Sequence, residues 1–551
     1  MLRAGVLIAA GLSLAACAAV EPNPQQSASY ADYLIGRVAN SREDFTVAAD
    51  RYFSALTRAP GDDALLRGAL IASLASGDEA RARRAARLAP REDAPGYAHL
   101  VRAADALTAR RWGQADASLN RVEGVASEEL MARLMAVWTR VAQGRIADVV
   151  AELGPLASVR PYGGLFAYQQ AMAFDYAVRP DDALAAYEIG ADSGMWLPAG
   201  VERHADLLVR RGRRDAAIAL LDTPVNQANP ALAAALARVR AGGAAAAAPL
   251  TPAIGASVAL YGLAAILIQE ADSTNALAAL TLSLMLDPSA DSSRLAFAQQ
   301  QTRLGHVALA QAALARVPET SPYFGSARIM QAWALLDAGH ADAALALARE
   351  NAAGGDARAL RTLADMHRSR GEYAEAEPLY SRLIEQQPQE WRLFFARGAA
   401  RERLGRWPEA EADFQRALQL SPDQPDVLNY LGYTWVDRGE RLEEGLALIQ
   451  RAAALRPQSG EIIDSLGWAY YRMGDFARAV DLLEHAVELE PADPILNDHL
   501  GDAYWRLGRR TEARYQWRRA LTQEPDDPAA IQAKIENGLP PLPAPPRTAQ
   551  R

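Results

Sequence analysis

The stretch that decides the fold is residues 460–491, GEIIDSLGWAYYRMGDFARAVDLLEHAVELEP. Small residues at Gly467 and Ala479 allow two helices to approach each other closely. Gly474 lies between them, and glycine tolerates the left-handed backbone that a helix end demands. Pro491 closes the stretch, because a proline cannot continue a helix. The stretch therefore predicts two antiparallel helices joined by a tight turn.

The same pattern recurs along the C-terminal part of the chain. Five prolines lie 34 or 35 residues apart, at Pro388, Pro422, Pro457, Pro491 and Pro525. The other recurring residues are the Leu-Gly pairs at 431–432, 466–467 and 500–501, the turn glycines Gly439, Gly474 and Gly508, and the small residues Ala376, Ala410, Ala479, Ala513, Ala417, Ala452, Ala486 and Ala520. A single helix pair cannot bury its apolar face alone, so this repetition predicts stability from the stacking of neighbours.

The pattern over residues 355–525 resembles the tetratricopeptide repeat. The resemblance implies an all-α fold, an α-solenoid of stacked helix pairs. Weaker forms of the pattern continue towards the N-terminus, at 33–60, 61–90, 97–124, 129–155, 165–194, 201–222 and 255–288. We therefore expect about fourteen pairs in all, closed by a cap helix over residues 531–537.

A change of composition interrupts the array. Residues 241–254 contain Gly242, Gly243, five consecutive alanines and Pro249. This predicts a linker between a divergent N-terminal solenoid, 30–240, and a C-terminal solenoid with its cap, 255–537; an alanine-rich helix is the alternative. The apolar run that follows, 254–268, is predicted to be a buried repeat helix. The proline-rich tail, 538–551, is predicted to be a disordered end, with a ligand for another protein as the alternative.

The only cysteine is Cys17, so the chain cannot form an internal disulfide. It ends the sequence Leu-Ala-Ala-Cys, which follows an apolar or small run over residues 4–13. This resembles the lipobox of bacterial lipoproteins, which implies a signal peptide at 1–16, lipid on the Cys17 thiol and a lipidated tether at 17–29. The alternative is an ordinary secretory signal. Ala18 stands where Asp would mark inner-membrane retention, which favours the periplasmic face of the outer membrane.

Composition and motifs argue against catalysis. The net charge of -9 argues against a nucleic-acid surface, which needs clustered basic residues. The single lysine, Lys534, is not part of a phosphate-binding loop, no histidine is followed by Glu, and no nucleophile elbow is present. An acid–base or metal role for His485 and His499 is the weaker alternative to solvated or capping positions. We therefore predict no enzyme activity, no cofactor, no metal and no small-molecule substrate.

The first helix of each repeat lines the concave groove in this architecture. Superposition of the last three full repeats predicts a protein-binding site of Asn429, Tyr433, Asp464, Trp468, Tyr471, Asp498, Asp502 and Trp505. Partly exposed Trp468 and Trp505 beside carboxylates are typical of binding hot spots. The alternative is that these rings pack on the adjacent repeat. The carboxylates would repel an acidic ligand, so a peptide with a basic or neutral face is favoured.

The segments Leu-Asn-Tyr-Leu-Gly-Tyr-Thr at 428–434 and Asp-Ser-Leu-Gly-Trp at 464–468 resemble those of large tetratricopeptide lipoproteins of Gram-negative bacteria. That resemblance implies an adaptor that brings a periplasmic protease, such as a carboxyl-terminal processing protease, or a cell-wall enzyme to its substrates. The alternative is a structural assembly factor for a secretion or outer-membrane biogenesis complex. Both functions imply protein partners and a membrane contact through the N-terminal lipid.

Overall fold

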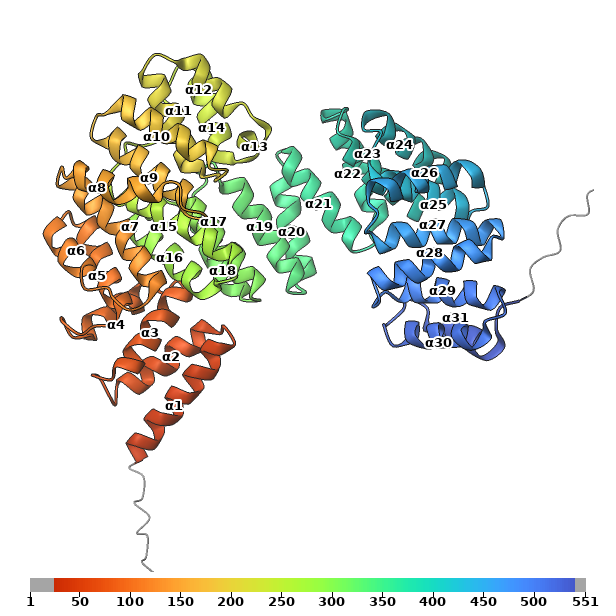
Figure 1. Cartoon of the computed structure of the whole chain (residues 1–551), viewed down its shortest axis with the longest axis horizontal. Helices are drawn as coiled ribbons and strands as arrows, with labels where there is room; N and C mark the ends of the chain where they lie inside the picture. Colours follow the sequence, from red (N-terminus) through yellow and green to blue (C-terminus); the bar gives the residue numbers. More distant parts are fainter. Residues whose placement is uncertain (1–23, 541–551) are drawn as a thin grey trace, which may run out of the picture. The chain divides into compact units, whose positions relative to one another are not determined.

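The computed structural model describes residues 24–540 and is all-α over that range, with 31 α-helices, one short 3₁₀ helix and no strand (Figure 1). Helices α1–α12 form six consecutive pairs and α15–α30 form eight, so the predicted solenoid of fourteen helix pairs is confirmed. The chain divides into two compact units, the first ending at Leu347 and the second beginning at Ala348. The division lies inside α20 (Ala341–Ala352).

The helices of the first unit before α20 are α1 (Pro24–Ser41), α2 (Phe45–Leu56), α3 (Asp63–Ala75), α4 (Glu79–Leu88), α5 (Gly96–Thr108), α6 (Trp112–Leu119), α7 (Ala126–Ala142), α8 (Ile146–Leu153), α9 (Gly163–Tyr176), α10 (Pro180–Asp192), α11 (Pro198–Arg210), α12 (Arg214–Leu221), α13 (Pro224–Ala228), α14 (Pro230–Arg240), α15 (Pro252–Gln269), α16 (Ser273–Leu286), α17 (Asp291–Arg303), α18 (Val307–Leu314) and α19 (Phe324–Asp337). The 3₁₀ helix, Gly154–Leu156, follows α8.

The helices of the second unit after α20 are α21 (Ala357–Ser369), α22 (Tyr373–Gln386), α23 (Trp391–Arg403), α24 (Trp407–Leu420), α25 (Pro425–Asp437), α26 (Leu442–Leu455), α27 (Gly460–Met473), α28 (Phe476–Leu489), α29 (Pro494–Arg506), α30 (Arg510–Leu521) and the cap helix α31 (Pro528–Asn537). The predicted glycine roles are confirmed here. Gly474 has a φ of 85° at the end of α27, and a Cβ on Gly467 would lie 2.7 Å from Leu483 of the paired helix. Small residues therefore set how closely the two helices of a pair approach.

The first unit is more than a simple stack of neighbours. Its apolar hairpin α15–α16 packs against the first helices of four earlier pairs, α3, α5, α7 and α9 (Figure 1). The Thr281 hydroxyl donates to the carbonyl of Leu74 at 2.7 Å, and the Gln301 amide donates to the carbonyl of Ala75 at 2.7 Å. The face that these first helices share is therefore covered by a later segment of the same chain.

The predicted boundary at 241–254 is wrong. Residues 241–251 form a loop within the first unit and are neither a linker between units nor a helix. Two hydrogen bonds hold this loop: the Ala246 N–H donates to Asp206 at 3.1 Å, and Arg203 donates to the Ala248 carbonyl at 2.7 Å. Helix α15, which follows the loop, packs against α7 in the same unit. A composition break cannot reveal such packing, because it depends on residues more than a hundred positions away.

The structure describes only some of the residues in the other predicted domains. The predicted signal peptide, 1–16, and most of the tail lie outside the described residues, as does the tether up to residue 23. The last six tether residues are helical, because α1 begins at Pro24. Helix α15 is long and apolar enough to cross a membrane, the one such helix found in residues 24–540, but 61% of its 18-residue window is buried. This agrees with the predicted buried repeat helix.

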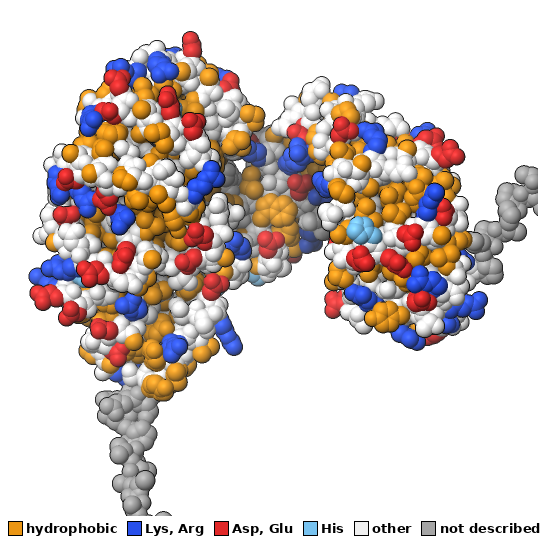
Figure 2. Space-filling model, in the orientation of Figure 1, with side chains coloured by type: hydrophobic (Ala, Val, Ile, Leu, Met, Phe, Trp, Pro, Cys, Tyr) orange, Lys and Arg blue, Asp and Glu red, His pale blue; other side chains and the backbone are white. Residues whose placement is uncertain are grey.

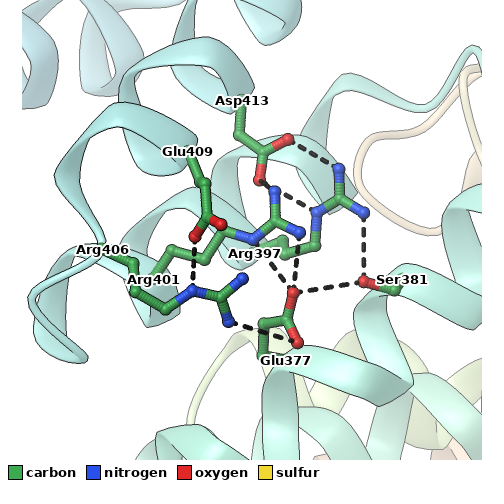
Figure 3. A network of polar contacts seen from close by, with 7 residues as sticks. All are labelled: Glu377, Ser381, Arg397, Arg401, Arg406, Glu409 and Asp413. Atoms are coloured by element: carbon green, nitrogen blue, oxygen red, sulfur yellow. Dashed lines mark hydrogen bonds and ion pairs between the residues drawn. The ribbon is translucent and has the colours of Figure 1, made fainter.

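A polar network joins three consecutive helices of the second unit, α22, α23 and α24 (Figure 3). Arg397 donates to both oxygens of the buried Asp413 carboxylate, at 2.9 and 2.7 Å. Arg401 bridges Asp413, at 2.8 Å, and Glu377, at 2.7 Å. Charged groups as buried as these are stable only when paired, so the network fixes how the two repeats meet.

Candidate protein-binding groove

A groove of about 480 Å³ lies on the second unit, along the first helices of four consecutive pairs, α23, α25, α27 and α29. Its lining residues are Glu402, Arg403, Asn429, Tyr430, Tyr433, Thr434, Asp437, Glu461, Asp464, Ser465, Glu490, Asp493, Ile495, Leu496 and His499. The position agrees with the prediction that first helices line the binding surface.

The groove is strongly acidic. Six of its lining side chains are carboxylates, and only Arg403 and His499 can carry positive charge. Glu461 is the carboxylate with neither a hydrogen bond nor an ion pair to its side chain among the described residues. Burial raises the pKa of Glu461, and the nearby carboxylates of Asp426 and Glu490 raise it further. A site where carboxylates crowd each other in this way favours a cationic ligand.

Asn429 supplies a second, independent feature of the groove. Its side chain on α25 is 6% exposed and lines the groove, yet its Oδ1 atom has no hydrogen-bond partner. An unpaired buried amide oxygen costs about 1–3 kcal/mol relative to one that is hydrogen-bonded. Asn429 therefore offers an acceptor that a ligand donor can satisfy.

Two tyrosines supply the aromatic part of the lining. Tyr430 donates its hydroxyl to Glu402 at 3.1 Å, and burial followed by the Glu402 charge raises the pKa of Tyr430 to about 12. Burial also raises the pKa of Tyr433, assisted by Asp437 and Asp464. Both rings are thus neutral and present aromatic surface beside carboxylates, a combination that suits Arg or Lys side chains.

Three of the predicted site residues, Asn429, Tyr433 and Asp464, line this groove, and the other five do not. The sequence predicts that the Asp464 carboxylate faces a ligand. In the structure it accepts a hydrogen bond from Nδ1 of His499 at 2.9 Å. Burial alone would lower the pKa of His499, but the adjoining Asp464 carboxylate raises it above its ordinary value. The pair crosses from α27 to α29 and joins two repeats at the floor of the groove.

Trp468 is engaged within the protein. Its ring stacks on His499, with centroids 4.1 Å apart, and on Tyr471, with centroids 4.5 Å apart. The Tyr471 hydroxyl in turn accepts from Arg506 at 3.1 Å. Of the two interpretations of Trp468, the structure favours packing on the adjacent repeat over a free contact surface.

The cap helix covers the C-terminal part of the predicted binding site, Asp498, Asp502 and Trp505. Lys534 donates to Asp498 at 2.7 Å and to Asp502 at 2.9 Å, so these carboxylates are neutralised within the chain. Burial raises the pKa of Asp502, while Lys534 opposes that change. The ring of Trp505 lies so close to Gly538 that it leaves no room for a Cβ at that position. Three aligned repeats could not reveal this cover, because it comes from α31, which follows the last repeat.

Several groove residues were missed by reasoning from sequence. Glu461 lies three residues before Asp464 on α27, hence one turn earlier on the same helix face, and that spacing could have identified it. Glu490 and Asp493 lie in the turn before α29 and also act as helix caps: Glu490 accepts from the Gly460 N–H and Asp493 from that of Ile495. Their capping role gave no signal of a binding site.

The comparisons with known proteins agree with this fold. Family models described as tetratricopeptide repeat match residues 329–390, 391–424 and 465–528. No curated protein sequence matches the chain. The matches thus place tetratricopeptide repeats mainly in the second unit.

Several solved structures are similar at low identity. A tetratricopeptide repeat protein of Parabacteroides merdae is 16% identical, over 44% of this chain and 97% of its own, with a TM-score of 0.38. The Cut9–Hcn1 hetero-tetramer of APC/C is 16% identical, over 93% and 97%, with a TM-score of 0.39. A thermophilic TPR protein of Thermus thermophilus is 21% identical, over 33% and 98%, with a TM-score of 0.30.

Proposed function

We propose that this chain is a lipid-anchored periplasmic scaffold for protein–protein interaction, and that the acidic groove of its second unit binds a cationic peptide segment of a partner. Tetratricopeptide repeats generally mediate such interactions, which supports the scaffold role. The observation that carries the groove's role is Asn429, whose buried Oδ1 atom lacks a partner inside an otherwise acidic lining.

The chemistry of the groove defines the ligand. Asn429 Oδ1 accepts from a peptide N–H or from an Arg or Lys side chain. Glu461 attracts a cationic side chain, and the rings of Tyr430 and Tyr433 lie close enough in the lining to contact it. A ligand that presents a free C-terminal carboxylate is repelled. Because exposed carboxylates supply much of the attraction, binding weakens as ionic strength rises.

The biological role we favour is that of an adaptor. Lipid on Cys17 anchors the chain to the periplasmic face of the outer membrane, where its repeats recruit a carboxyl-terminal processing protease or a cell-wall hydrolase. The support for this is the lipobox and the resemblance of residues 428–434 and 464–468 to adaptor lipoproteins. An assembly factor for a secretion or outer-membrane biogenesis complex is the second candidate.

A pull-down from detergent-solubilised membranes, analysed by mass spectrometry, tests this proposal. Co-purification of a protease with hydrolase substrates supports the adaptor, whereas a secretion complex supports the assembly factor. The same pull-down with Asn429→Ala tests the groove: partners that are captured equally well by this variant bind elsewhere. Palmitate labelling tests the anchor, because Cys17→Ser should abolish the label.

A further inference from the structure

The outer face of α1, the first helix that the structure describes, is apolar and has no partner among residues 24–540. Tyr30, Leu34, Ile35 and Val38 are 63%, 41%, 43% and 51% exposed. Tyr30, Leu34 and Val38 are spaced four residues apart and so lie above one another on one side of the helix. Figure 2 shows hydrophobic side chains gathered at this end of the first unit.

The opposite face of α1 is the one that packs in the fold. Asp32, Gly36 and Ala39 are buried, and a Cβ on Gly36 would lie 3.1 Å from the ring of Tyr52 on α2. Within the described residues, helix α1 therefore packs on one side only, and the apolar side chains of its other side have no neighbour. The first helix of a repeat array normally turns a polar face outward, since no further repeat covers it.

The other end of the chain follows that rule. The cap helix α31 exposes Gln532 and Glu536 on its outer side. An apolar terminal face is thus not a general property of this solenoid. Its presence on α1 alone indicates a specific contact at the N-terminal end.

The length of the preceding chain identifies what that contact is. Six residues lie between Cys17 and Pro24, the first residue of α1. The chain from Cys17 to Pro24 spans at most about 25 Å, so acyl chains on Cys17 would hold α1 close to the surface of the bilayer. Such a tether raises the effective concentration of the face at the membrane, so a small apolar patch suffices for binding.

Charge and area favour a lipid surface over a second copy of the chain. Arg37 on α1 and Arg42 in the turn directly after it are exposed, and Arg42 has no ion-pair partner among the described residues, which suits anionic headgroups. The exposed parts of the four apolar side chains amount to about 400 Å². Two copies in contact would bury only about 800 Å², less than the roughly 1,200 Å² of a specific protein interface.

We propose that the outer face of α1 lies in the headgroup region of the membrane and forms a second contact besides the lipid anchor. The first unit is then held against the bilayer with a defined orientation instead of being attached through the lipid alone. This inference rests on the proposed anchoring at Cys17, but the contact itself can be tested with a different anchor.

The test uses the chain from residue 18 to 551, which contains no cysteine because Cys17 is the only one. An N-terminal histidine tag binds this chain to vesicles of phosphatidylethanolamine and phosphatidylglycerol that contain a nickel-chelating lipid. The environment-sensitive dye NBD is attached at Val38→Cys. The matched control is NBD at Val225→Cys, also on the first unit and 61% exposed.

We expect NBD at position 38 to become at least twofold brighter on the vesicles and to be quenched by spin-labelled lipids, with no change at position 225. Adding Leu34→Glu and Ile35→Glu should abolish the response, while circular dichroism stays unchanged because both side chains are exposed. Equal responses at positions 38 and 225 overturn the proposal. A response without vesicles, accompanied by a dimer in sedimentation, also overturns it in favour of a second copy.

Failure of the anchor and failure of the face give different results. If Cys17 is not acylated, palmitate labelling fails while the dye at position 38 still responds on nickel vesicles. If the face does not bind lipid, labelling succeeds and the dye does not respond.

Discussion

Arg397 and Asp413 form a doubly hydrogen-bonded ion pair, with N···O distances of 2.7 and 2.9 Å, at positions where neighbouring repeats carry leucine. Arg397 precedes Gly398 as Leu431, Leu466 and Leu500 precede the corresponding glycines of the later repeats, and Asp413 aligns with Leu448 and Leu482. One repeat therefore replaces an apolar contact between its two helices by an ionic one.

The first prediction follows from this exchange. Asp413→Ala leaves Arg397 without its main partner in a buried site, which should lower the free energy of unfolding by about 3–5 kcal/mol. Arg397→Leu with Asp413→Leu restores the pattern of the neighbours and should be far closer to the wild type, since well-packed apolar residues often replace a buried pair at no cost. Urea denaturation monitored by circular dichroism measures both. A double variant as unstable as the single one would show that the pair is needed for its charge.

Trp468→Ala is expected to weaken the fold more than the binding of a partner. Its ring stacks between His499 and Tyr471, so its removal should lower the free energy of unfolding by about 2–4 kcal/mol. Trp468→Phe, which keeps an aromatic ring there, should lose clearly less. Denaturation midpoints of both variants decide the question, and normal stability of Trp468→Ala with impaired partner capture would restore the sequence-based interpretation.

The His499–Asp464 pair should make stability depend on pH. The pKa of His499 is raised in the folded state, so the folded chain binds its proton more tightly than the unfolded chain, whose histidine titrates near 6.5. The stabilisation is therefore complete below about pH 6.5 and is lost as the pH rises through the folded-state value. Urea midpoints between pH 6 and pH 9 should fall for the wild type and change much less for His499→Gln. Parallel curves would exclude this pair as the cause.

The groove should discriminate ligands by charge. A peptide rich in arginine should bind the second unit at low salt, and Glu461→Gln should weaken that binding by roughly three- to tenfold, about 1 kcal/mol. Glu488→Gln is the matched control, because Glu488 lies on α28 outside the groove lining with its side chain 79% exposed. Fluorescence anisotropy in 50 and 300 mM salt gives both comparisons. Equal affinities of the two variants would place the cationic site elsewhere.

The regular part of the fold was predictable because every repeat needs small residues where its two helices approach and a glycine in the turn between them. Gly467 and Gly474 allow close approach and a tight turn, and both act as expected. The position of α15–α16 was not predictable, because a contact between distant residues such as Thr281 and Leu74 produces no repeating pattern in the sequence. At the site, Asn429 was identified by its place on a first helix.

The predicted site residues differ most from the groove where a side chain from another helix pair or from the cap helix contacts them. Lys534 neutralises Asp498 and Asp502 from the cap helix, and His499 pairs with Asp464 from the next repeat. Alignment of repeats shows which side chains share a position, but it cannot show which of them find a partner across an interface. Charge at a groove position is therefore a weaker signal than burial without a partner, which only the structure reveals.

The contacts of α16 and α17 with α3 also have a kinetic consequence. The hydrogen bonds from Thr281 to Leu74 and from Gln301 to Ala75 close chain loops of more than 200 residues, whereas helices of the second unit contact mainly their neighbours in sequence. High contact order slows folding, because the entropy of loop closure must be lost before the contacts form. The first unit should thus reach its native state only after residue 301 has emerged during synthesis or export. The second unit can form pair by pair as it emerges, so the part of the chain made last can be the first to become native.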